Sequence, residues 1–183
     1  MRIKSQMPIG VTAGAKTCRK CGVLCCFPHR IDGYTTVVSA AKEARDARDC
    51  EDPFFEIWVV FDTEGIQNTV RQQSARRAIS QASNLGFRHA VSNPSFEYWL
   101  LLHFEYCVKT FPNGAAVETA LKKYIPTYGK GMNCFHIVRK HTPTAIKNAV
   151  KNHEDRCRHI GPHPCDCHPS TQIHLLIERI QSF

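Results

Sequence analysis

The chain has 183 residues, of which 43% are hydrophobic and 22% charged, so it suits one folded domain and is not a wholly disordered chain. Its formal net charge of +8 favours nucleic acid as a partner, although total charge does not show where the basic side chains gather. No stretch approaches the ~20 apolar residues of a membrane span, and the first twenty residues lack the apolar run of a secretory signal. We therefore expect a cytoplasmic protein with no membrane partner.

The N-terminal part is the poorest in structural signals. Residues 1–35 contain scattered Gly and Pro and no sustained periodicity, so we expect an irregular or degenerate segment there and an α/β domain over residues 36–183. Apolar residues near helical spacing predict a helix over 37–48, and Pro53 prevents its continuation.

The middle of the chain alternates between strands and helices. Residues 55–61 are aromatic, β-branched and almost continuously apolar, which is typical of a strand buried on both faces. A helix over 66–84, a strand over 87–91, a turn over 92–95 and a helix over 96–105 follow. This order predicts a small Rossmann-like parallel sheet flanked by helices. The remainder is expected to be mainly helical, with helices over 115–125, 142–158 and 171–180 and a loop over 161–169.

An acidic turn follows the strongest strand. Asp62 and Glu64 come directly after it, where ligands of open α/β sheets bind. Residues two apart in an extended turn can both point toward one ion, and carboxylates suit Mg²⁺, which can polarise a phosphate and activate water. The alternative is structural, because Asp is also a common turn residue and helix N-cap.

The segment Ser92–His103 is the most unusual stretch. Asn93 and Pro94 predict a turn at the carboxyl end of the second strand, on the same rim as Asp62. Glu97 lies in the first turn of the next helix, where the helix dipole alone already favours a carboxylate. His103 follows six residues later, and it is a candidate for proton transfer only if it reaches Asp62 or Glu97; otherwise it is a structural histidine.

These residues resemble the RloB-like family. The specific match is the block Asn-Pro-Ser-Phe-Glu-Tyr-Trp-Leu-Leu-Leu-His over 93–103, preceded by Val-Val-Phe-Asp-Thr-Glu over 59–64. Weaker matches are Lys-Tyr-Ile-Pro over 123–126, Tyr-Gly-Lys-Gly over 128–131 and His-Pro-Ser-Thr over 168–171. The resemblance covers residues 37–183.

The resemblance implies a bacterial protein tied to restriction-modification and abortive-infection loci, often encoded beside an ATPase. It also implies a Toprim-like sheet, in which an acidic pair after a later strand binds Mg²⁺ for phosphodiester chemistry. Asp62 and Glu64 match that pair, with Glu97 as a further ligand or base and His103 as a partner. Asn93, Lys123 and Lys130 are the expected substrate contacts.

The start of the chain departs from the family pattern. Family members usually begin with a strand followed by a Glu-Gly-Glu-Lys-Thr-Glu-like motif, whereas here the first acidic residue is Asp32. We therefore expect the catalytic glutamate to be missing, together with an internal strand. This departure favours an alternative function: a catalytically inactive module that binds nucleic acid or a partner ATPase.

The ten cysteines raise the question of a zinc site. Without a secretory signal, reduced thiols or metal ligands are expected rather than disulfides. Two candidate groups exist, an early pair at Cys18 and Cys21 and a late group formed by His163, Cys165, Cys167 and His168. Their spacing is irregular compared with zinc modules, so Zn²⁺ is disfavoured, and a zinc-stabilised regulatory domain is the weakest of the three hypotheses.

Overall fold

A computed structural model describes residues 14–18, 23–27, 33–47, 56–65, 69–160 and 163–183. A five-stranded sheet, in which the strands lie in chain order, forms its centre. The strands are β1 (Gly14–Cys18), β2 (Val23–Phe27), β3 (Glu56–Asp62), β4 (Arg88–Asn93) and β5 (Ser170–Thr171). β2, β3 and β4 are mutually parallel, while β1 and β5 pair antiparallel at the two edges. The predicted α/β fold is confirmed.

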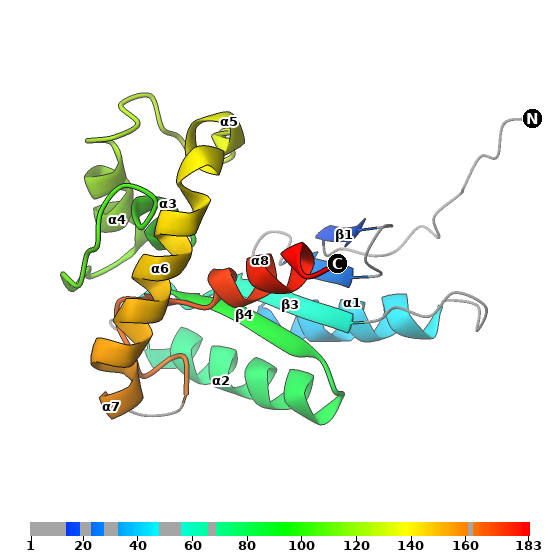
Figure 1. The fold of residues 1–183 in the computed structure, drawn as a ribbon. Coiled ribbons are helices and arrows are strands. Elements are labelled where there is room, and N and C mark those ends of the chain that lie inside the picture. Colours follow the sequence, from blue (N-terminus) through cyan, green and yellow to red (C-terminus); the bar gives the residue numbers. More distant parts are fainter. Residues whose placement is uncertain (1–13, 19–22, 28–32, 48–55, 66–68, 161–162) are drawn as a thin grey trace, which may run out of the picture.

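Helices cover both faces of this sheet. The helix α1 (Tyr34–Asp46) connects β2 to β3, and α2 (Thr69–Asn84) connects β3 to β4; the two pack side by side on one face (Figure 1). The helices after β4 lie on the other face and at the carboxyl ends of the strands: α3 (Glu97–Leu101), α4 (Gly114–Leu121), α5 (Phe135–Val138), α6 (Thr142–Asn152), α7 (Arg158–Ile160) and α8 (Ile173–Gln181).

The strand β3 is buried on both faces, as its apolar run predicts. Ile57, Val59 and Phe61 contribute to the core under α1 and α2, while Trp58 and Val60 contribute to the core on the opposite side. This alternation follows from the two-residue period of a strand.

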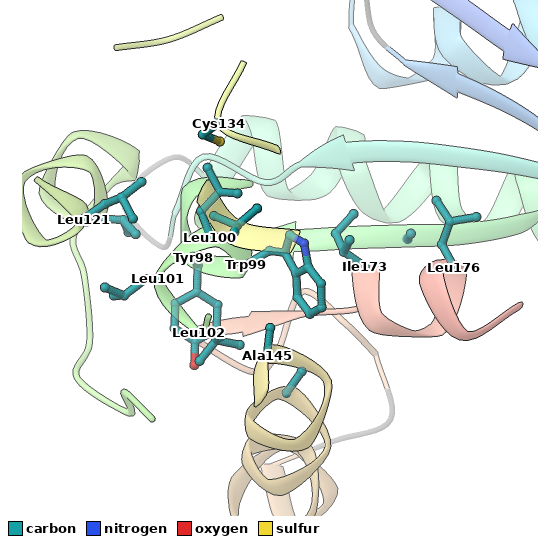
Figure 2. Close-up of a cluster of buried hydrophobic side chains, with 14 of the residues drawn as sticks. Tyr98, Trp99, Leu100, Leu101, Leu102, Leu121, Cys134, Ala145, Ile173 and Leu176 are labelled. Atoms are coloured by element: carbon teal, nitrogen blue, oxygen red, sulfur yellow. The ribbon is translucent and has the colours of Figure 1, made fainter. Parts of the chain in front are cut away.

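The second core is built around α3. Figure 2 shows Trp99 pointing toward Ala145 of α6 and Ile173 of α8, with Tyr98 and the leucines around it. Every residue of α3 is buried, so the helix is anchored on all sides and holds its first turn firmly against the end of β3.

The structure corrects three expectations about the elements. Residues 14–18 and 23–27 form strands, so the prediction that residues 1–35 are irregular is wrong for them. The pair Ser170–Thr171 forms a short edge strand where the start of a helix was expected. The predicted helix over 142–158 consists of α6, a π-helical turn (His153–Cys157) and the start of α7.

Within the part of the chain that the structure describes, no helix combines the length and the apolar composition needed to cross a membrane.

Candidate functional site

The carboxyl ends of β3 and β4 lie side by side and form a common rim. Asp62 is paired with Ser92 in the parallel register. The pairing continues beyond the strand, because the N–H of Thr63 donates to the carbonyl of Ser92 at 2.9 Å and that of Glu64 donates to the carbonyl of Pro94 at 2.8 Å. The acidic turn and the Asn-Pro segment therefore meet on the rim, as the sequence predicts.

Asp62 lies at the centre of this rim. Its carboxylate accepts a hydrogen bond from the backbone N–H of Phe96. Burial raises the pKa of the Asp62 carboxyl to about 7; the Phe96 N–H opposes this, the negative charge of Glu97 adds to it, Lys130 opposes it and Glu64 adds a smaller effect. An acid with such a pKa changes its charge near neutral pH, which is a property of many catalytic and ligand-binding acids.

Glu97 provides the second acid. It is the first residue of α3 and is 6% exposed. Its Oε1 accepts a hydrogen bond at 3.0 Å from the hydroxyl of Tyr128, in the loop after α4. We call Asp62 and Glu97 the acid pair: two neighbouring carboxylates, each held by one donor of the protein.

Glu64 is oriented differently from the expectation. It is exposed, its backbone has a φ of 61°, and its carboxylate forms an ion pair with Arg71 of α2. In the described part of the chain, no three His, Cys, Asp or Glu side chains are grouped closely enough to hold a metal ion. The three-carboxylate ligand set expected from the sequence is thus reduced to the acid pair.

Two carboxylates still fit Mg²⁺, because this ion is commonly bound by one or two carboxylates while waters and substrate phosphates fill the other positions. A nearby buried hydroxyl, that of Ser95, has no hydrogen-bond partner among the described residues. An unpaired buried polar atom next to the acid pair is consistent with a ligand or water at this place.

Two of the other predicted residues have structural partners. The amide of Asn93 is fully buried; its Nδ2 donates to the carbonyl of Cys167 at 2.9 Å, and its Oδ1 bonds Nδ1 of His168 at 2.8 Å. His103 is buried against Trp99, with Nδ1 bonded to the Trp99 carbonyl at 3.0 Å, and burial lowers its pKa. We therefore leave Asn93 and His103 out of the proposed site.

The two predicted lysines differ in position. Lys130 is exposed, and its charge acts on Asp62 and on Glu118 of α4, so it stands near the acid pair. The charge of Lys123 acts on Cys107 instead. Of these two lysines, we therefore include only Lys130 in the candidate site.

One pair of cysteines contradicts the expectation that all of the thiols are reduced. Cys157 and Cys167 form a disulfide, with 5.0 Å between their Cα atoms. Cys167 is therefore no thiolate ligand, and His168 is engaged by Asn93 and Phe111, so the late group is no zinc site in this structure. The side chain of Cys18 and all of Cys21 lie outside the described residues.

Sequence reasoning missed three members of the site. Tyr128, Ser95 and Gly114 lie within blocks that resemble the family or next to a helix start, but nothing in their residue types alone predicts that Tyr128 bonds Glu97 or that Ser95 packs against Gly114. Tyr128 is more than sixty residues away from Asp62 in the chain, so only the tertiary fold brings the two together.

The mostly parallel sheet flanked by helices defines an α/β protein of the Rossmann-like class, and the acid pair lies at the carboxyl ends of its parallel strands, where ligands of such sheets commonly bind. A family model described as RloB-like protein matches residues 25–180. The chain belongs to the RloB-like family. No curated protein and no solved structure matches the chain.

Proposed function

We propose that this chain is a Toprim-like, Mg²⁺-dependent nuclease component of a bacterial phage-defence system of the abortive-infection type, acting with an ATPase encoded nearby. The observation that supports the chemistry best is the acid pair at the carboxyl edge of the parallel strands, in which Glu97 is buried, Asp62 is half-buried and the pKa of Asp62 is raised to about 7. The defence role and the ATPase partner rest on family membership and the resemblance it implies.

In this proposal Asp62 and Glu97 hold the divalent ion, which when bound supplies Lewis acidity for a phosphodiester. The N–H of Phe96 fixes the carboxylate of Asp62, and the Tyr128 hydroxyl fixes that of Glu97, so that neither has to reorganise on binding. Lys130 offsets the negative charge of an incoming phosphate.

Metal binding and cleavage test this proposal separately. Isothermal titration with Mg²⁺ and Mn²⁺, and cleavage of labelled single-stranded DNA, duplex DNA and RNA, are measured for the wild type and for Asp62→Asn and Glu97→Gln. We expect both substitutions to reduce metal affinity and metal-dependent cleavage at least 100-fold, since each removes half of the ligand set. Glu43→Gln, an exposed acid of α1, is the matched control. Cleavage that survives Asp62→Asn would refute the proposal.

A second candidate function is a catalytically inactive module that binds nucleic acid or the ATPase. It is favoured by the small number of acids: within the described residues only two carboxylates converge at the rim, and none of them comes from the end of β2. Residues 28–32, which include Asp32, lie outside the described part. Retention of nucleic-acid binding by Asp62→Asn, with no cleavage by the wild type under any metal, would support this alternative.

A further inference from the structure

The amino end of α4 faces the rim next to the acid pair. A Cβ atom placed on Gly114, the first residue of this eight-residue helix, would lie 3.0 Å from both Cβ and Oγ of Ser95. The side chain of Asn113 accepts the N–H of Ala116 at 3.0 Å. The N–H groups of Gly114 and Ala115 belong to the first helical turn, which has no intrahelical acceptors, and no described residue supplies one.

Ser95 is the second and independent observation. It is only 5% exposed, and its Oγ has no hydrogen-bond partner among the described residues. Its closeness to the Cβ position of Gly114 shows that the hydroxyl is directed at the start of α4. A buried hydroxyl without a partner is costly unless a ligand or a water satisfies it.

The charge of one lysine acts on groups beside this helix. The charge of Lys130 acts both on Asp62, at the end of β3, and on Glu118, in the second turn of α4. Its ammonium group is therefore within electrostatic reach of both the acid pair and this helix. The group combines an ammonium, a hydroxyl and free amides at the positive end of a helix dipole, which are the donors that phosphate oxygens accept from.

We propose that Ser95, the Gly114 and Ala115 amides, and Lys130 form a phosphate-binding subsite that positions a nucleic-acid phosphate beside the acid pair. This inference rests on the proposed function and specifies its substrate contact. Gly114 is required because any side chain at this position would press on Ser95, whose atoms already lie against this residue.

The test uses the full chain in EDTA, so that no metal is present. Ligand-observed NMR titrations compare a 5′-phosphorylated dinucleotide with its 5′-hydroxyl counterpart. We expect the wild type to bind the phosphorylated probe at least fivefold more tightly. Gly114→Ala and Ser95→Ala should abolish this preference, and Lys130→Ala should reduce it.

Gly129→Ala is the matched control, because a Cβ at Gly129 would meet no atom within 4 Å. Circular dichroism checks that each variant is folded, and Ser95→Ala alone decides the matter if Gly114→Ala does not fold. Equal affinity of the wild type for both probes, or an unchanged preference in Ser95→Ala, would overturn the inference. Because the assay contains no metal, a chain that shows the preference but cleaves nothing would contradict the proposed nuclease activity and leave this subsite supported.

Discussion

The two ends of β3 hold carboxylates in opposite surroundings. At the amino end, Glu56 accepts a hydrogen bond from Nε1 of Trp58 at 3.0 Å and forms ion pairs with Arg179 at 3.0 Å and Arg88 at 3.2 Å. At the carboxyl end, Asp62 has one backbone donor and a second carboxylate, Glu97, as its neighbour. One acid is surrounded by cations and the other is not.

The pKa values follow this difference. Burial tends to raise the pKa of Glu56, but the bonds from Trp58 and Arg179 and the charges of Arg88 and Arg179 outweigh it, so that the pKa is lowered. At Asp62 burial dominates and raises the pKa to about 7. A carboxylate stabilised by paired cations is a structural element. A carboxylate whose ionised form is disfavoured by burial and a neighbouring negative charge binds a cation or a proton readily. The comparison thus supports the proposal that Glu56 is a structural acid and Asp62 a ligand-binding one.

The largest expected effect is a gain of stability in Asp62→Asn. The folded-state pKa of Asp62 lies above the unfolded value of about 3.9, so the native state binds the proton more tightly, and the wild type loses stability as the pH rises from about 4 to about 7. Asparagine has no charge to bury and still accepts from Phe96. We expect the variant to match the wild type at pH 4 and to be about 2 kcal/mol more stable at pH 8.

Urea unfolding at pH 4, 6 and 8 measures this gain. Mg²⁺ at pH 8 should raise the unfolding midpoint of the wild type and leave that of Asp62→Asn unchanged, because a ligand stabilises the state that binds it. A variant that is less stable than the wild type at pH 8 would show that Asp62 is a structural acid like Glu56, and the comparison between the two ends would fail.

A smaller effect is expected for Tyr128→Phe, which removes the hydroxyl bonded to Glu97. The ring stays buried while a buried carboxylate loses its donor, so we expect a loss of about 1.5 kcal/mol at pH 8. The chain supplies a matched control, because the hydroxyl of Tyr124 donates to Glu105 at 2.9 Å on the surface. Tyr124→Phe should cause no measurable change in urea unfolding. Equal losses of stability in both variants would mean that the hydrogen bond to Glu97 contributes no more than the one to Glu105 on the surface.

The sequence predicts correctly that the acidic turn and the Asn93–Pro94 segment lie side by side, for a simple reason. A continuous apolar run identifies β3 as a strand buried on both faces, and the next strand along the chain is its parallel neighbour. The residues after both strands must then share one rim, which places Asp62 near the Asn93–Pro94 segment without knowledge of the rest. Glu97 is also expected near this rim, because the next helix begins directly after the turn.

The sequence does not predict what depends on distant contacts. The segment Val23–Phe27 contains two cysteines, so its strand character becomes evident only from pairing with β3. The side-chain amide of Asn93 forms hydrogen bonds with a carbonyl and a histidine more than seventy residues away, and this makes it a structural residue. The left-handed backbone of Glu64 turns a side chain that alternation alone would place beside Asp62 toward Arg71.

The smallest effect concerns the amino end of β3, where Glu56→Gln removes the charge shared by two arginines. We expect a loss of about 1 kcal/mol at pH 7, because solvent screens Arg88 and Arg179, whose side chains are 60% and 34% exposed. The folded-state pKa of Glu56 is lowered, so its contribution is present above the unfolded value of about 4.3 and is lost as the pH falls through the folded value. The variant and the wild type should therefore approach each other in urea unfolding as the pH falls through the folded value. At high pH the sign is opposite to that of Asp62→Asn, because Glu56→Gln is less stable than the wild type there. Glu178→Gln, an exposed acid of α8, should be neutral throughout this pH range. If Glu56→Gln instead became more stable than the wild type with rising pH, the folded state would disfavour the ionised carboxylate at both ends of β3. The position of a carboxylate along the strand would then no longer distinguish a structural acid from a functional one.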